Sequence, residues 1–154
     1  MTSFSENSFN PPREPIIAVT FDLDGLMFNT EDLYQESGDI ILSRRGKKFT
    51  ADLLDQMMGR PAPIALQLMI DYHALSATPD QLAKETAEIF AELLPTKLAP
   101  MPGLLDLLAA LEKSSIPKGI ATSSGRQFVD RVLEIAGVSD RFAFVVASED
   151  EVKG

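Results

Sequence analysis

A short apolar strand that ends in two aspartates is the feature that most constrains this chain. The β-branched run Ile16-Ile17-Ala18-Val19-Thr20-Phe21 has the composition of a strand covered on both faces in a parallel sheet. It is followed at once by Asp22-Leu23-Asp24-Gly25, which is typical of a turn. Because ligands of parallel α/β sheets bind beyond the carboxyl ends of the strands, the two carboxylates predict a chemical site there.

Two carboxylates spaced two residues apart can divide the chemistry between them. One can attack or bind a metal while the other moves a proton. An Asx turn that merely ends a strand is the structural alternative. A calcium loop is excluded, because Gly25 is fourth and not sixth in the loop and apolar residues 26–28 occupy ligand positions.

A second motif, Ile120-Ala121-Thr122-Ser123-Ser124-Gly125, runs from a strand into small hydroxyl residues before a helix. Hydroxyls, free backbone N–H groups and a helix N-terminus together bind anions. Taken alone, such residues are more often only a helix cap. On a strand that neighbours the first motif, they favour an anion-binding site.

Helical patterns fill residues 31–94. Thr50 can cap a helix that ends near residues 58–59, and Thr78-Pro79-Asp80-Gln81 combines a capping box with proline at the first helical position. The helix after this box carries Leu82, Ile89, Phe90 and Leu93 on one face. Four such helices predict a small bundle.

From residue 101 the pattern alternates between helices and strands. Leu104, Leu108 and Leu111 mark a helix, and strands are predicted over 118–122 and 144–147. A second helix carries Phe128, Val132 and Ile135 and ends at Gly137. The pattern predicts an α/β fold with a parallel sheet.

This pattern divides the chain into a core and an insert. The predicted fold is a three-layer Rossmann-like core, incomplete at the C-terminus, with an inserted α-helical bundle cap. The predicted parts are a flexible tail (1–14), the core (15–29 and 101–154), the cap (30–94) and a proline-containing hinge (95–100).

Composition narrows the class of function. The chain has 154 residues, no cysteine and a formal net charge of −9. The charge argues against nucleic-acid partners, and the apolar runs are too short to cross a membrane. The lack of cysteine gives no support to an oxidising compartment, and we predict a cytoplasmic location.

The segments FDLDGLMFNTE and, about a hundred residues later, ATSSG flank the helical insert. In this arrangement the sequence resembles the haloacid dehalogenase-like superfamily over roughly residues 16–154, and specifically its helical-cap phosphatase and phosphomutase branch. The resemblance implies that Asp22 is the nucleophile that forms an aspartyl-phosphate. It implies that Asp24 is the general acid and base, that the Asp22 carboxylate and the Asp24 backbone carbonyl hold Mg²⁺, and that Thr122, Ser123 and Ser124 bind phosphate. Asn29 stands where many relatives have aspartate.

The resemblance also implies two later motifs. These are a lysine within Lys-Pro-x-Pro-Asp and an acidic pair after a fourth strand. Lys153 precedes the position expected for that lysine, and Glu149 and Asp150 follow the third strand, so we interpret the two acids as a solvated turn. The implied fourth strand lies beside the first, so we expect an exposed sheet edge that a partner chain or a further segment would cover. We expect the 154 residues alone to be inactive.

Substrate contacts are expected from the cap. Gly59 and Arg60 lie where relatives place a specificity loop, and Arg60 either reaches a substrate anion or is a surface arginine. Tyr34 and Ala62 replace the histidine and the basic residue of phosphomutase relatives, so hydrolysis of a small, sugar-phosphate-like metabolite is favoured. A phosphomutase, or a phosphate- or partner-binding module without turnover, is the alternative. His73 is interpreted as structural.

Overall fold

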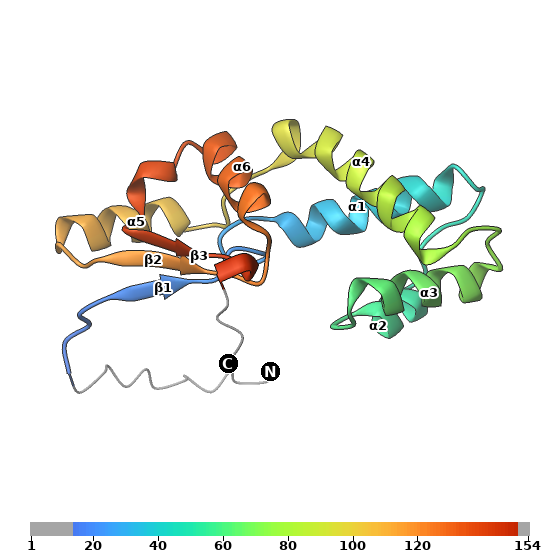
Figure 1. Cartoon of the computed structure of the whole chain (residues 1–154), viewed down its shortest axis with the longest axis horizontal. Helices are drawn as coiled ribbons and strands as arrows, with labels where there is room; N and C mark the ends of the chain where they lie inside the picture. Colours follow the sequence, from blue (N-terminus) through green and yellow to red (C-terminus); the bar gives the residue numbers. More distant parts are fainter. Residues whose placement is uncertain (1–13, 151–154) are drawn as a thin grey trace, which may run out of the picture.

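The computed structural model describes residues 14–150, which form a three-stranded parallel sheet and a helical bundle beside it (Figure 1). The elements follow in the order β1 (Val19–Phe21), α1 (Thr30–Ser43), α2 (Ala51–Met57), α3 (Ala62–His73), α4 (Pro79–Lys97), α5 (Leu104–Lys113), β2 (Lys118–Ala121), α6 (Arg126–Ala136), η1 (Ser139–Arg141), β3 (Phe144–Val146) and η2 (Ser148–Asp150). The predicted α/β class and parallel sheet are confirmed. No helix among residues 14–150 is long and apolar enough to cross a membrane.

The sheet has the order β1-β2-β3, so β2 is central and the two strand ends that carry the polar motifs are neighbours. Phe21 pairs with Ile120, and Ala121 pairs with Val146. Because the strands are parallel, Asp22 and Thr122, which directly follow β1 and β2, leave the sheet at the same edge. This topology positions the site.

The first strand is shorter than predicted. It begins at Val19, and Ile16 and Ile17 are 53% and 82% exposed. The Val19 amide donates to the Pro117 carbonyl at 3.0 Å. Pro117 has no amide hydrogen, so the ladder of hydrogen bonds cannot continue toward residue 17.

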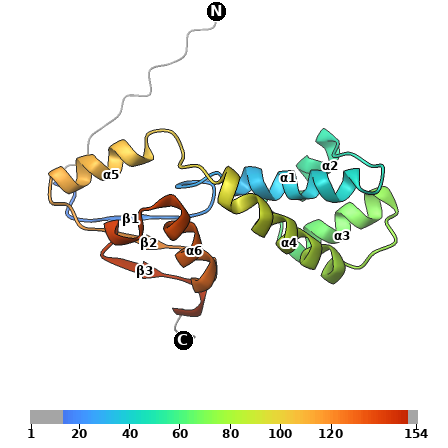
Figure 2. The ribbon, with the colours of Figure 1, turned by 90° about the horizontal axis from the view of Figure 1, so that it is seen from above.

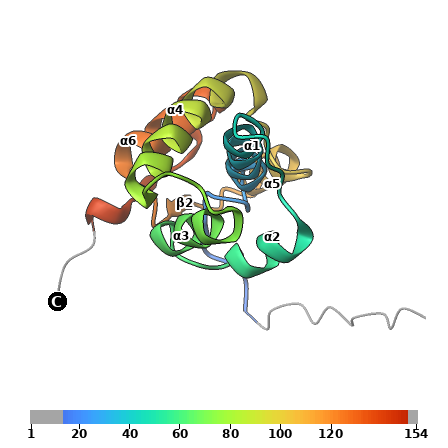
Figure 3. The same ribbon diagram turned by 90° about the vertical axis from the view of Figure 1, so that its right-hand side faces the viewer.

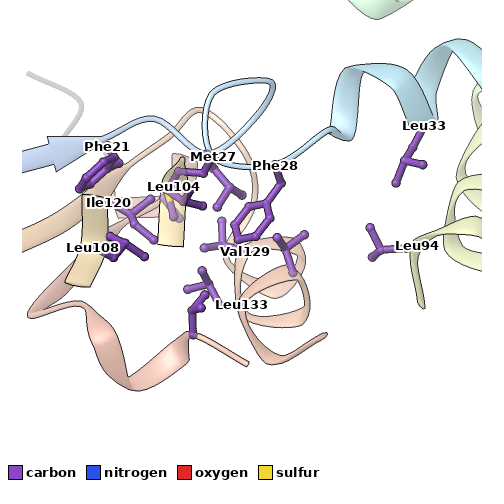
Figure 4. Close-up of a cluster of buried hydrophobic side chains, with 14 of the residues drawn as sticks. Phe21, Met27, Phe28, Leu33, Leu94, Leu104, Leu108, Ile120, Val129 and Leu133 are labelled. Atoms are coloured by element: carbon purple, nitrogen blue, oxygen red, sulfur yellow. The ribbon is translucent and has the colours of Figure 1, made fainter. Parts of the chain in front are cut away.

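One face of the sheet carries the core. Phe21 and Ile120 pack with Leu104 and Leu108 of α5 and with Val129 and Leu133 of α6 (Figure 4). Leu108, Ile120 and Val129 are fully buried. The predicted stripe of α5 is confirmed, whereas α6 is rotated from its predicted face. Val129, Val132 and Leu133 of α6 are buried, and Phe128 and Ile135 lie at the margin of the core.

The opposite face of the sheet is open within residues 14–150. Thr20, Ala121, Phe144 and Val146 point to that face and are exposed. The ring of Phe144 covers Gly119, where a Cβ atom would come within 2.5 Å of the ring. Two layers are therefore present in the described residues, which agrees with a core that is incomplete.

The free edge of β1 borders a groove. Among the described residues no strand pairs with this side of β1. A cavity of about 410 Å³ lies there, lined by residues that include Thr20, Phe21, Leu26 and Leu107. Leu26 and Leu107 are 57% and 48% exposed, so the edge combines unpaired backbone groups with apolar side chains.

The four helices α1–α4 form the insert, and their predicted caps are present. The Thr50 hydroxyl accepts from the Leu53 amide at 3.2 Å. Thr78 and Gln81 form the reciprocal capping box, with distances of 3.3 and 2.9 Å. The bundle has its own apolar cluster, which includes Ile41, Leu53, Met69, Leu82 and Ile89.

The insert joins the sheet through the start of α1 and the end of α4 (Figure 2). Viewed from the bundle end, α1 is seen nearly along its axis, with α4 beside it (Figure 3). Leu33 and Leu94 belong to the core cluster and face each other there (Figure 4). Helix α4 extends to Lys97, so Pro95 lies inside a helix and only residues 98–100 of the predicted hinge lie outside it.

Candidate active site

The loop after β1 holds its two aspartates in different surroundings. The Asp22 side chain is exposed, and its Oδ1 accepts from the Leu23 amide at 2.8 Å. Gly25 adopts φ +68°, a conformation that favours glycine. Its amide donates to the fully buried Thr30 hydroxyl at 3.1 Å. The turn therefore leaves the Asp22 carboxylate facing solvent.

Asp24 meets the second motif directly. The Ser124 hydroxyl donates to Asp24 Oδ2 at 2.5 Å, and the Thr122 hydroxyl approaches the same oxygen at 3.5 Å. The Ser124 amide donates to the Thr122 hydroxyl oxygen at 3.2 Å. Asp24 Oδ1 is buried without a hydrogen-bond partner among the described residues. Ser123 is exposed beside these groups.

These contacts join residues about one hundred positions apart in the sequence. Asp22 and Asp24 follow one strand, and Thr122 and Ser124 follow its neighbour. The arrangement offers an exposed carboxylate, a second carboxylate with an unpartnered oxygen, and hydroxyl and amide donors. That set can bind an anion and move a proton to or from it.

Asn29 connects the two segments of chain that run between the sheet and the insert, one before α1 and one after α4. Its Oδ1 accepts from the Ala99 amide at 2.8 Å, and its Nδ2 donates to the Lys97 carbonyl at 3.2 Å. The Asn29 amide also donates to the Ala99 carbonyl at 3.1 Å. An aspartate could not supply the Nδ2 donor, so the side-chain amide is matched to this position.

A divalent cation fits the chemistry of this site. Mg²⁺ takes oxygen ligands, uses one or two carboxylates and keeps several waters. The exposed Asp22 carboxylate supplies such oxygens, and Asp24 Oδ1, which has no hydrogen-bond partner among the described residues, stays available for proton transfer. Within residues 14–150 there is no group of three or more histidine or acidic side chains that could hold a metal.

The acidic turn after β3 is structured. The Glu149 carboxylate accepts from the Arg126 amide at the start of α6, at 2.9 and 3.1 Å. Asp150 accepts from the Ala147 amide at 2.9 Å and pairs with the Arg126 guanidinium. These backbone and arginine donors hold the pKa of both carboxyls below their usual values. Lys153 lies outside the described residues.

Gly59 and Arg60 lie apart from these groups, in the loop between α2 and α3. Arg60 is exposed, and its Nε donates to the Gln56 carbonyl at 2.6 Å. Both residues line an open cleft of about 1670 Å³ between the insert and α6. Tyr34 lines the same cleft. Burial, followed by the charges of Asp24 and Glu31, raises the pKa of the Tyr34 phenol.

Sequence reasoning missed three contributions to this site. They are the buried Thr30 hydroxyl beneath the Gly25 turn, the direct Ser124–Asp24 contact, and the Asn29 clamp. A polar residue next to the double-aspartate turn was the available signal for Thr30 and Asn29. Nothing in the sequence specified which serine would face Asp24.

The fold and the paired motifs define a class of α/β proteins that carry out chemistry at the carboxyl ends of parallel strands. Comparison with known families is specific: the haloacid dehalogenase-like hydrolase family matches residues 19–154. The chain belongs to this family. The family relationship predicted from the two motifs is therefore confirmed.

Individual relatives agree with this membership. (DL)-glycerol-3-phosphatase 2 of Arabidopsis thaliana is 35% identical over 120 residues, which are 77% of this chain and 50% of that protein. A phosphorylated carbohydrates phosphatase of Thermotoga maritima is 28% identical over 141 residues, 88% of this chain and 62% of that protein. The chain thus spans about half to two-thirds of the length of these relatives.

The fold is shared with solved structures. A Thermotoga maritima structure, named provisionally as a beta-phosphoglucomutase, superposes with a TM-score of 0.77 and 25% identity. The match covers 89% of this chain and 63% of that one. The Rossmann-like assignment is confirmed by this likeness.

Proposed function

We propose that this chain carries the nucleophile and the phosphate-binding residues of a phosphoric monoester hydrolase that acts on a small phosphorylated metabolite. The contact between Asp24 and the hydroxyls of Thr122 and Ser124 carries the proposal, because it joins the two motifs at one sheet edge. The names of the curated relatives, which are phosphatases of small phosphate esters, support it.

The proposed reaction uses the two aspartates in turn. A carboxylate oxygen of Asp22 attacks phosphorus and forms an aspartyl-phosphate while the bond from phosphorus to the ester oxygen breaks. Asp24 gives a proton to the departing alcohol. Water then attacks the phosphorus, Asp24 takes a proton from it, and Asp22 is released with inorganic phosphate.

The remaining residues would position the phosphoryl group. The Thr122 and Ser124 hydroxyls and the exposed Ser123 would donate to its oxygens, which requires Thr122 and Ser124 to turn from Asp24. The Asp22 carboxylate and the Asp24 backbone carbonyl would hold Mg²⁺, which would neutralise charge on the phosphoryl oxygens. The closing cap would bring Gly59 and Arg60 over the substrate.

The nucleophile is tested with a phosphoryl mimic that needs no turnover. We expect the chain with Mg²⁺ and beryllium fluoride to give a bound ¹⁹F resonance that disappears in Asp22→Asn. Asp55→Asn, which removes an exposed carboxylate of α2, is the control and keeps the resonance. Absence of a bound signal in the wild-type chain, or its survival in Asp22→Asn, would overturn the proposal.

Turnover separates a hydrolase from a phosphate-binding module. Hydrolysis of an aryl phosphate that is lost in Asp22→Asn would support the hydrolase and contradict the expectation that these 154 residues alone are inactive. A beryllium fluoride complex without hydrolysis would favour the phosphate-binding module for the isolated chain. The cover for the β1 edge, a partner chain or a further segment, remains a prediction.

A further inference from the structure

The cleft between the insert and α6 has an aromatic wall. The rings of Tyr34 and Phe90 lie 4.3 Å apart and are tilted by 30°, and those of Phe90 and Phe128 lie 5.8 Å apart. Tyr34 comes from α1, Phe90 from α4 and Phe128 from α6. All three line the cleft. We call these three residues the aromatic wall.

The wall is partly uncovered. Phe90 is buried, with an exposed fraction of 5%, whereas Tyr34 is 47% exposed and Phe128 is half-buried. Phe90 therefore packs in the core, while the rings of Tyr34 and Phe128 are partly exposed to the cleft. An exposed aromatic ring next to a cleft gains from contact with a second flat ring.

Small side chains of the insert helices line the cleft beside the aromatic wall. Ala83, Ala87 and Ala91 of α4 recur every four residues on the cleft, so they lie on one side of that helix. Ala62 and Ala65 of α3 line the same cleft. Small side chains at these positions leave the volume beside the aromatic wall open.

The carboxylates next to Tyr34 disfavour a negative charge on the ring that would stack there. Burial is the largest cause that raises the pKa of the Tyr34 phenol. The negative charges of Asp24 and Glu31 raise this pKa further. The phenol therefore stays neutral at physiological pH and can donate a hydrogen bond. A second phosphate or a carboxylate on the ligand would meet like charge there.

We propose that the aromatic wall binds a neutral planar ring in the alcohol part of the phosphate ester, with Tyr34 as the residue that determines this specificity. This inference rests on the proposed function, which places the phosphate of the substrate at the aspartates. The alcohol part of the substrate would then extend into the cleft beside Tyr34. The proposal narrows the substrate class from small phosphate esters to those whose alcohol carries a flat, uncharged ring.

A pair of probes tests the wall without requiring catalysis. Uridine carries a neutral planar ring on a sugar, and ribose is the same sugar without the ring. Binding is measured through the methionine methyl resonances in ¹H–¹³C spectra. Met57, Met58 and Met69 line the cleft, whereas the buried Met27 and the Met101 of the β1 groove report on other places.

We expect uridine to shift the three cleft methionines and ribose to leave them unchanged. Tyr34→Ala should weaken uridine binding at least about fivefold, the effect expected for loss of one ring stack. Tyr72→Ala is the matched control, because Tyr72 is similarly exposed (42%) but lies on α3 and hydrogen-bonds to Thr50. Ala87→Leu should fill the cleft and weaken binding without removing an aromatic ring.

Two results would overturn this inference. One is that ribose and uridine shift the same methyl groups with equal affinity. The other is that uridine binds equally to the wild-type chain, Tyr34→Ala and Ala87→Leu. Failure of the proposed function is a separate result, since it appears as a missing beryllium fluoride complex whether or not uridine binds.

Discussion

At the scale of single residues, the site depends on a few hydrogen bonds between distant segments. Ser124 reaches Asp24 across a separation of 100 residues, and Asn29 reaches residues 97 and 99. Ser123 lies between two hydroxyl residues that contact Asp24, yet it is exposed. Two adjacent serines of one motif therefore differ, because Ser124 contacts Asp24 and Ser123 faces solvent.

The Ser124–Asp24 contact predicts an energetic coupling. Ser124→Ala should lower the free energy of unfolding by about 1–2 kcal/mol, because it removes a donor to a carboxylate whose other oxygen has no partner within residues 14–150. A double-mutant cycle with Asp24→Ala, measured by urea unfolding, should give a coupling energy of about 1 kcal/mol or more. Ser123→Ala is the control, and equal effects of the two serine substitutions would refute the contact.

The Asn29 clamp predicts that aspartate is a poor replacement. Asn29→Asp should destabilise the chain by about 1 kcal/mol, because it loses the donor to Lys97 and places a carboxylate oxygen near that carbonyl. Asn29→Ala should cost more, since it also loses the acceptor for the Ala99 amide. Urea unfolding gives the order, and unchanged stability of Asn29→Asp would contradict this account.

At the scale of elements, one acidic side chain links α5, β2 and η1. Glu112 Oε1 lies 2.9 Å from the buried Lys118 ammonium and 2.8 Å from Nε of Arg141. These two cations lower the pKa of the Glu112 carboxyl from 4.5 to about 2, with Arg141 the larger cause. Lys118 is only 6% exposed, so the Glu112 carboxylate compensates a cation removed from water.

This link predicts a pH dependence of stability. The folded pKa of Glu112 is below its unfolded value, so its contribution is fully present above pH 4.5 and is lost as pH falls toward 2. Glu112→Gln should therefore lower the melting temperature at pH 7 and reduce the decline in stability between pH 4.5 and 2. Asp106→Asn, an exposed carboxylate on the same helix, serves as control. Parallel pH profiles for wild type and Glu112→Gln would contradict the prediction.

At the scale of the whole molecule, the sheet is covered on one face and unpaired along β1 within the described residues. The exposed backbone of an edge strand pairs readily with another chain. The apolar groove beside β1 adds exposed Leu26 and Leu107 to that edge. We therefore expect copies of this chain to associate with one another through the β1 edge.

Self-association can be measured directly. We expect sedimentation to show concentration-dependent oligomers of the 154-residue chain, and Thr20→Lys on β1 to reduce them, because lysine on an edge strand opposes further pairing. Thr96→Lys, at an exposed position of α4 and not on a strand, is the control. A monomeric wild-type chain at high concentration would refute this prediction.

Much of the local structure could be predicted from sequence because its causes are local. The caps at Thr50 and Thr78, the stripe of α5 and the glycine that ends α6 all follow from residues within one or two helical turns. The start of β1 could not be predicted in this way. It depends on Pro117, which is about one hundred residues away and adjacent only after the strands pair.

The sequence by itself determined the α/β class, the family and the identity of the paired aspartates, because these follow from hydrophobic periodicity and contiguous motifs. Only the tertiary structure decided which oxygen of Asp24 meets Ser124, how Asn29 joins the two crossings, and that Phe128 packs beside Phe90 at the margin of the core. The physical reason is that side-chain contacts depend on distances between segments, and those distances exist only once the chain has packed.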